Sequence, residues 1–337
     1  MRKSIHLAYK VFIRMVLVMV VLTAIYGCQP ATESVPPGPP LKLSLGLPPF
    51  PYSGLVAIAD KKGFFKESGL DLSIKDYAFG FATLEAVAKG EVQMGMGNES
   101  TFAMMINNDP SLRLAASVAL VNTNEIVVRR DRGIHNPADL KGKRIGFCPN
   151  TSSEYYLLSF LLVNRIPLTE VTMVKVPGPG LVEAIVNGEV DALSAWDTVV
   201  YDAKKRLKDN ATSWPAQNNR DWQWVLVVKD ATTQSPEALR RFLKALLKAE
   251  DFVLTHREEA KNIIARRWGF EPAFMQQIWD KTRLSVTLNQ SLIPSLESFS
   301  QWSRTKEGKE GEGPNFLKYI YADALAQVDP KVVTIFK

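Results

Sequence analysis

The sequence predicts an α/β protein made of two doubly wound α/β lobes that are joined by two hinge strands. Three observations lead to this fold class. Two stretches about 100 residues apart repeat the same pattern, short apolar strands alternate with amphipathic helices, and two further apolar strands stand where the chain would change lobes. A length of 337 residues exceeds one ordinary core and fits two lobes. With 46% hydrophobic and 23% charged residues, the composition is that of a globular protein.

Residues 1–27 predict a signal peptide. A basic start is followed by an uncharged, mostly aliphatic run over residues 15–27. This run is too short for a spanning helix, which needs about 20 residues. The formal charge of the whole chain is +6, but four basic residues and no acidic one lie in this segment. The remainder is nearly neutral, which gives no support for nucleic-acid binding.

Ile25-Tyr26-Gly27-Cys28 resembles a bacterial lipobox, although Tyr26 is bulkier than the usual second residue. The resemblance implies cleavage before Cys28 and lipidation of its thiol. The alternative is an uncleaved membrane anchor with a chance cysteine. Either alternative places most of the chain in the periplasm or another extracytoplasmic space. Residues 28–41 are rich in proline, which predicts an extended linker between the lipid and the folded part.

The first repeated pattern is a short apolar strand that ends in a proline-bearing loop. It occurs at residues 43–48 and again at residues 143–149, an offset of 100 residues. Each loop leads into a predicted helix, at residues 53–59 and at residues 152–158. The two stretches therefore predict the same strand, loop and helix in each lobe.

The second repeated pattern is an amphipathic helix, a glycine in C-cap position and a buried strand. It occupies residues 84–95, with Gly90, and residues 182–193, with Gly188. Strands that alternate with helices predict parallel sheets with helices on both faces. Ligands bind outside the carboxyl ends of such strands. Two lobes that face each other would enclose a cleft there.

Two apolar stretches, at residues 125–129 and 222–228, are the predicted hinge strands. The first would carry the chain out of lobe one, and the second would carry it back. Lobe one is therefore predicted over residues 42–124 and 226–337, and lobe two over residues 125–225. Ser235 and Pro236 predict the start of a helix, and the rest of the chain predicts helices that pack on lobe one. Residues 305–314, charged and rich in glycine, predict a mobile loop.

Residues 53–65 and 69–72, and then residues 191–197, resemble segments of the periplasmic binding proteins for sulfonates, taurine, nitrate and the thiamine pyrimidine precursor. The resemblance extends from about residue 42 to about residue 260. It implies the type II periplasmic binding fold and the substrate-binding component of an ABC importer. The implied partners are a small organic ligand and a membrane permease with its ATPase. A monomer without a cofactor is expected.

The departures from the family pattern leave the ligand open between a sulfonate, a carboxylate and a pyrimidine-like molecule. Binders of the pyrimidine precursor carry a tryptophan and a histidine in the first loop. Here Tyr52 stands near the histidine position, and the loop contains no tryptophan. Thr198 replaces the proline that follows the aspartate in the sulfonate-type members.

Ten residues at predicted strand ends and helix starts are the candidate ligand contacts: Phe50, Tyr52, Ser53, Asn98, Ser100, Asn150, Thr151, Ser152, Trp196 and Asp197. The hydroxyl and amide residues at helix starts either cap the helix or donate to a ligand. Trp196 offers a flat face with an N–H group, or it belongs to the core. Asp197 would accept from an amine or amide, or it caps the next helix. Phe50 and Tyr52 either form the pocket wall or pack within their loop.

Catalysis is not expected. The chain lacks Gly-x-Ser-x-Gly, the P-loop motif and His-Glu-x-x-His, and its three histidines share no metal-ligand spacing. A related thiamine-pyrimidine enzyme uses a histidine and a cysteine-rich iron motif, which this sequence also lacks. Cys148 lies at a predicted strand end, where a lone cysteine behaves as a small apolar residue. A ligand sensor that signals to a membrane receptor is the other alternative, and the sequence does not separate it from import.

Overall fold

The computed structural model describes residues 38–217, 220–233 and 235–336. The predicted signal peptide, the lipidation site Cys28 and most of the predicted linker lie outside these residues. The chain from Gly38 to Lys337 forms one compact unit. Within the described ranges, no helix has both the length and the apolar character needed to cross a membrane.

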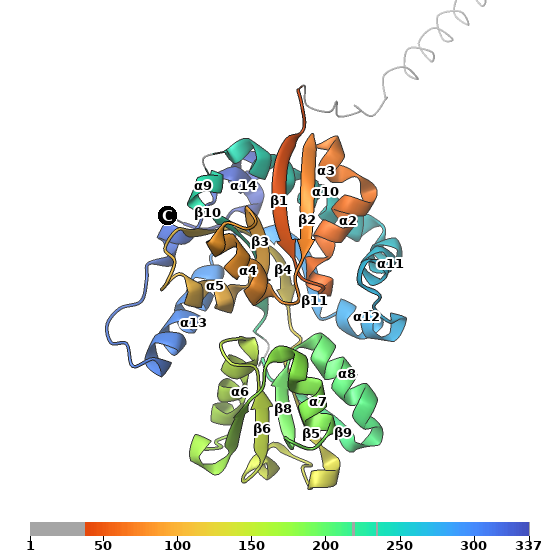
Figure 1. The fold of residues 1–337 in the computed structure, drawn as a ribbon, viewed down its shortest axis with the longest axis vertical. Helices are drawn as coiled ribbons and strands as arrows, with labels where there is room; N and C mark the ends of the chain where they lie inside the picture. Colours follow the sequence, from red (N-terminus) through yellow and green to blue (C-terminus); the bar gives the residue numbers. More distant parts are fainter. Residues whose placement is uncertain (1–37, 218–219, 234, 337) are drawn as a thin grey trace, which may run out of the picture. The chain divides into compact units, whose positions relative to one another are not determined.

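The first lobe is built on a six-stranded mixed sheet with the order β11-β4-β10-β3-β1-β2 (Figure 1). β1 pairs in parallel with β2 and β3, whereas β10 is antiparallel to β3 and β4, and β11 is antiparallel to β4. The strands are β1 (Leu41–Leu47), β2 (Leu70–Asp76), β3 (Met94–Asn98), β4 (Leu112–Val121), β10 (Trp222–Lys229) and β11 (Thr282–Thr287).

The second lobe is built on a five-stranded mixed sheet with the order β7-β6-β8-β5-β9. β6 pairs in parallel with β7 and β8, and β5 is antiparallel to β8 and β9. The strands are β5 (Glu125–Arg129), β6 (Arg144–Phe147), β7 (Thr172–Lys175), β8 (Ala192–Ala195) and β9 (Ala211–Pro215).

Helices accompany both sheets, and Figure 1 shows α6, α7 and α8 around the second one. The α-helices are α2 (Gly54–Lys62), α3 (Phe64–Glu67), α4 (Gly80–Lys89), α5 (Glu99–Met105), α6 (Ser152–Val163), α7 (Leu181–Val186), α8 (Asp197–Leu207), α9 (Asp230–Thr233), α10 (Pro236–Thr255), α11 (Arg257–Trp268), α12 (Pro272–Trp279), α13 (Leu292–Lys306) and α14 (Asp323–Val328). The 3-10 turns are η1 (Pro51–Ser53), η2 (Arg130–Arg132), η3 (Pro137–Leu140), η4 (Leu168–Glu170), η5 (Gly178–Gly180), η6 (Lys208–Asn210), η7 (Phe316–Tyr319) and η8 (Pro330–Val332).

The internal repeat appears as matched elements of the two sheets. The pair β1 and α2 corresponds to β6 and α6, and the pair α4 and β3 corresponds to α7 and β8. Gly90 and Gly188, which follow α4 and α7, have φ values of 75° and 77°. A side chain at these left-handed positions would be strained, so glycine is what lets each helix turn into its buried strand.

The prediction of purely parallel sheets is wrong for the strands near the crossovers. The chain leaves the first sheet between β4 and β5 and returns between β9 and β10, and these strands run antiparallel to their neighbours. The predicted lobe boundary after residue 225 falls inside β10, whose first residues already pair with β3 and β4. β10 is buried along nearly its whole length, which is typical of a central strand rather than of a free connection.

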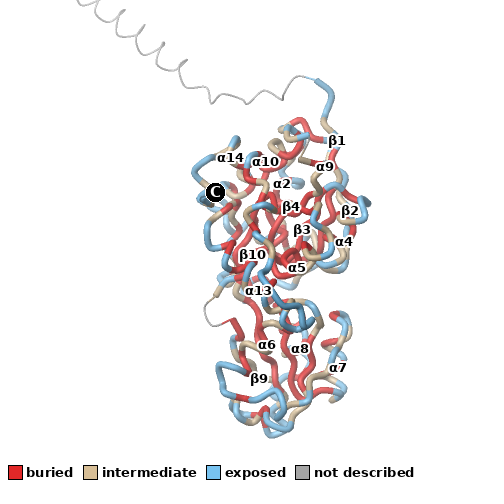
Figure 2. The backbone as a smooth tube through the Cα atoms, turned by 90° about the vertical axis from the view of Figure 1, so that its left-hand side faces the viewer, coloured by how far each residue is buried: buried red, intermediate tan, exposed pale blue. Residues whose placement is uncertain are grey.

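The side chain of Gln217, in the second crossover, forms hydrogen bonds with the first crossover. Its side-chain oxygen accepts from the backbone N–H groups of Thr123 and Asn124 at 2.6 and 2.7 Å, and its Nε2 donates to the carbonyl of Val121 at 3.0 Å. Figure 2 shows that buried residues run through the strands of both lobes. The strands β1, β3, β6 and β8 are thus anchored in the buried core of their lobe, and this fixes the position of their carboxyl ends.

Candidate ligand-binding cleft

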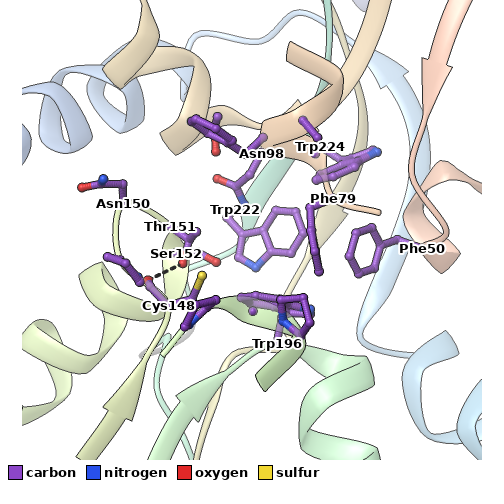
Figure 3. Close-up of a pocket in the computed structure, with 18 of the residues that line it drawn as sticks. Phe50, Phe79, Asn98, Cys148, Asn150, Thr151, Ser152, Trp196, Trp222 and Trp224 are labelled. Carbon is purple, nitrogen blue, oxygen red and sulfur yellow. Dashed lines mark hydrogen bonds between the residues drawn. The ribbon is translucent and has the colours of Figure 1, made fainter. Parts of the chain in front are cut away.

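A cavity of about 410 Å³ lies between the two lobes, at the ends of their strands (Figure 3). Its lining comes from the segments that follow β1, β2 and β3 in lobe one and β6, β7 and β8 in lobe two, and from the start of β10. The lining residues are Phe50, Tyr52, Phe79, Gly80, Phe81, Ala82, Asn98, Thr101, Cys148, Pro149, Asn150, Thr151, Ser152, Pro177, Gly178, Pro179, Trp196, Trp222 and Trp224.

Four aromatic rings of lobe one pack into a continuous wall. Phe50 and Tyr52 are stacked with their ring centroids 4.9 Å apart, and Tyr52 meets Trp222 and Trp224 edge-on at 5.0 and 4.6 Å. A Cβ atom at Gly80 would come within 2.6 Å of the Trp224 ring. Glycine at this position therefore lets the start of α4 approach the wall.

The three indole N–H groups of the cleft differ in their partners. Trp222 Nε1 donates to Asn124 Oδ1, and Trp224 Nε1 donates to Ser53 Oγ, both at 3.2 Å. Trp196 Nε1 is buried and has no hydrogen-bond partner among the described residues. A buried donor without a partner costs free energy of folding. Trp196 is therefore the indole whose N–H group is available to donate to a ligand.

Phe79 of lobe one and Trp196 of lobe two meet across the cleft, with ring centroids 6.3 Å apart. A Cβ atom at Gly178 would touch both rings, at 3.4 and 3.3 Å. A second cavity of about 470 Å³ lies on the other side of these rings, and Phe50, Phe79 and Trp196 line both spaces. The rings thus divide the space between the lobes into two chambers.

Most polar groups at the helix starts are already engaged within the protein. Asn98 Oδ1 accepts from Ser100 N at 2.8 Å and from Ser100 Oγ at 2.6 Å, which caps α5. Thr151 Oγ1 donates to the carbonyl of Cys148 at 2.8 Å and accepts from Ser153 N at 3.2 Å, which caps α6. These two bonds occupy the Asn98 oxygen, so the NH₂ group is the end of that side chain that can donate to a ligand.

No charged side chain lines the cavity in the described part of the chain, but two acids are buried next to lining residues. Glu99 follows Asn98 and is fully buried, and burial raises its pKa to about 8. Asp197 follows Trp196, and burial raises its pKa to about 7. Burial and the nearby Asp197 raise the pKa of Tyr52 well above its ordinary value.

The structure brings seven of the ten predicted contacts to the cavity: Phe50, Tyr52, Asn98, Asn150, Thr151, Ser152 and Trp196. Ser53, Ser100 and Asp197 do not line it. Ser53 Oγ accepts from Trp224, Ser100 Oγ donates to Asn98, and Asp197 Oδ1 accepts from Thr198 N at 2.7 Å. Their side chains serve the elements behind the wall, and for these three residues the predicted position in the cleft is wrong.

Sequence reasoning missed most of the aromatic lining. Trp222 and Trp224 lie in a stretch assigned to a hinge, although their period-two spacing places both on one face of a strand. Phe79 and Phe81 flank Gly80 at the start of α4. The segment Pro177–Pro179 has no recognisable signal beyond its prolines.

Cys148 lines the cavity without the environment of a reactive thiol. Burial raises the pKa of the Cys148 thiol, which disfavours the nucleophilic thiolate. The lining contains no histidine in the described part of the chain. Across the described residues, no group of three or more His, Cys, Asp or Glu is placed to hold a metal ion.

Residues 51–260 match the family model described as "NMT1/THI5 like". The chain belongs to this family. The match covers more than half of the chain and confirms the family predicted from the sequence. The matched segment runs from the loop after β1 through lobe two and into α11, so it includes nearly every residue that lines the cleft.

Known proteins resemble the chain at the level of sequence and of fold. The taurine-binding periplasmic protein of Escherichia coli is 27% identical over 200 residues, which are 58% of this chain and 61% of that protein. A 4-amino-5-hydroxymethyl-2-methylpyrimidine phosphate synthase of Aspergillus parasiticus is 25% identical over 227 residues, 60% of this chain and 64% of the synthase. The alkanesulfonate-binding protein SsuA of Xanthomonas axonopodis pv. citri has a TM-score of 0.71 at 16% identity, covering 85% of this chain and 99% of SsuA. The type II binding-protein fold is therefore confirmed.

Proposed function

We propose that the chain is the extracytoplasmic substrate-binding component of an ABC importer, which closes its two lobes over a small organic molecule. The observation that carries the proposal is the interlobe cleft. Its lining comes from both lobes, at the strand ends where α/β sheets bind ligands. The family match and the taurine-binding relative support the same function.

Closure would use the two crossovers as hinges. Lining residues of lobe one and lobe two can contact the same ligand at once only when the lobes are close together. A ligand that binds the closed state better shifts the population toward it. The closed form would then be the form that the membrane permease and its ATPase recognise.

Lipidation at Cys28 would hold the protein at the membrane surface, with residues 29–40 as the tether. Replacing Cys28 with serine removes the thiol that receives the lipid. We expect the Cys28→Ser variant to appear in the soluble extracytoplasmic fraction and the native chain in the membrane fraction. Equal distribution of both proteins would contradict lipid anchoring.

A binding protein fits the cleft better than an enzyme does. One relative is a synthase, so an enzyme is the alternative that has to be tested. The Cys148 thiol, however, has a raised pKa and no base among the described lining residues. Its environment supports the role of a small wall residue.

The first test is native mass spectrometry of residues 29–337, which contain the whole compact unit from Gly38. We expect a small molecule that co-purifies and is released unchanged on denaturation. Release of a chemically altered molecule would favour the enzyme. Deleting the chain from its host should then abolish uptake of that molecule. Intact uptake with a lost transcriptional response would favour a sensor.

A further inference from the structure

We infer that the ligand is an uncharged aromatic compound, bound mainly through its ring faces rather than through an anionic group. The inference rests on the proposed function and names the substrate class for its cleft. It separates this chain from its taurine-binding relative, because taurine has no ring and carries a sulfonate.

The first support is the chemistry of the wall. Seven of the lining side chains are aromatic, and none is charged in the described part of the chain. Trp222 and Trp224 hold fixed orientations, because their N–H groups are bonded to Asn124 and Ser53. Phe81 is 46% exposed and belongs to the lining, so its ring is accessible to a ligand. Ring faces held in this way favour a flat apolar ligand.

The second support is that side chains of the protein itself already cap the starts of α5 and α6. At α6, the Glu154 carboxylate already accepts from Asn150 N at 2.8 Å, and Thr151 already accepts from Ser153 N. At α5, the side chain of Asn98 takes the N–H of Ser100. A helix start attracts an anion through free N–H groups, and the side-chain caps of α5 and α6 each occupy one of these groups.

The third support is the charge behind the lining. The nearby cation Lys306 is paired with Glu154, at 2.8 Å, and with Asn150 Oδ1, at 3.0 Å. Asp197 and Glu99 are buried acids next to lining residues, and neither offers a positive charge to an anion in the cleft. The described lining therefore offers no cation to balance the charge of a sulfonate or a carboxylate.

The remaining polar groups define what the ring should carry. Trp196 Nε1 is a buried donor without a partner among the described residues, and the Asn98 NH₂ group is a second donor at the cavity. Both donate, so the compound should present hydrogen-bond acceptors, such as carbonyl, amide or sulfonamide oxygens, at the edge of the ring. This pattern needs acceptors but no formal charge.

Calorimetry on residues 29–337 with isosteric probes tests the inference. Benzenesulfonamide and benzenesulfonate have nearly the same shape but differ in charge, and taurine carries the sulfonate without the ring. We expect benzenesulfonamide to bind at least about tenfold more tightly than the other two compounds. Tighter binding of taurine or benzenesulfonate would overturn the inference and still support the proposed function. Failure of every ring compound up to its solubility limit would also overturn it.

Two variants sharpen the test without disturbing the core. Phe81→Ala removes an exposed ring and should weaken benzenesulfonamide at least about threefold. Ala82→Lys adds a cation to the lining and should reverse the preference, so that benzenesulfonate binds more tightly. The control is Glu85→Gln, which changes the net charge of α4 by the same amount at a residue outside the lining. An equal gain for benzenesulfonate in this control, or no gain in Ala82→Lys, would contradict the role of the uncharged lining.

Discussion

Trp196 combines the two properties expected of a ligand contact at the scale of one residue. Its ring lines both chambers of the cleft, and its N–H group lacks a partner in the described structure. Cys148 lines the same cavity, and its backbone N–H and carbonyl groups bond to Ser153 and Thr151 at the start of α6. The two residues therefore make a matched pair for mutation.

We expect Trp196→Ala to weaken binding of the co-purified ligand by about 2 kcal/mol, a factor of about 30, because it removes both the ring face and the donor. Cys148→Ser should change the affinity by less than about threefold, since the two side chains have similar size. Titration calorimetry measures both values. If both variants have equally small effects on the affinity, Trp196 does not contact the ligand.

Asp197 makes the stability of the protein depend on pH. Burial raises its pKa from 3.8 to about 7, so the folded state binds a proton that the unfolded state has released. The stability contributed by this residue therefore falls as the pH rises from about 4 to about 7. The difference amounts to a few kcal/mol at most, at about 1.4 kcal/mol per pKa unit.

We expect Asp197→Asn to remove this loss while its side-chain oxygen keeps the bond from Thr198 N. The melting temperature of the variant, relative to the native protein, should rise between pH 4 and pH 7 and then level off. Asp209→Asn, at an exposed aspartate of lobe two, is the control. A constant difference across this pH range would show that Asp197 is not the titrating group.

At the scale of elements, α13 of lobe one reaches α6 of lobe two. The Lys306 ammonium group donates to the Glu154 carboxylate and to Asn150 Oδ1. Tyr155 shares a hydrogen bond with Ser298 at 3.0 Å and packs on Phe299, with ring centroids 4.4 Å apart. These contacts cross from one lobe to the other beside Asn150, which lines the cavity.

Losing the Lys306 contact should favour an open arrangement of the lobes. We expect Lys306→Ala to increase the radius of gyration of the ligand-free protein in small-angle scattering, because the buried Glu154 carboxylate loses its cation. The matched control is Lys309→Ala, whose ammonium group pairs with Glu307 of the same lobe. Equal scattering profiles for the two variants would exclude a closing role for Lys306.

The sequence predicted repeated elements better than unique ones. The two repeats indicated β1, β3, β6 and β8, because their apolar strands follow the same loops and glycines at matched spacing. β11 was missed, since it lies between helices and becomes a strand by pairing with β4. Helix α13 continues to Lys306, so the loop predicted at residues 305–314 starts two residues too early.

At the scale of the whole molecule, the proposed function requires the two lobes to move. We expect the saturating co-purified ligand to reduce the radius of gyration, because contacts to both lobes form together only in the closed state. Small-angle scattering with and without the ligand measures this change. An unchanged radius at saturation would contradict hinge closure.

The sequence by itself determined the family, the two-lobed α/β fold and the edge of the sheets where the cleft lies. The hydrophobic period, the glycine caps and the repeat of about 100 residues can all be recognised in the sequence without a structure. Seven of the ten residues predicted at that edge line the cavity, and their contact with a ligand stays a prediction.

The tertiary structure decided which side chains face the cleft. Ser53, Ser100 and Asp197 stand next to lining residues in the chain, but their bonds to Trp224, Asn98 and Thr198 N hold them behind the wall. Trp222 and Trp224 come to Tyr52 from a strand 170 positions further along the chain. Such contacts depend on strand pairing and on which hydrogen bonds are already satisfied. A short segment of sequence determines neither property.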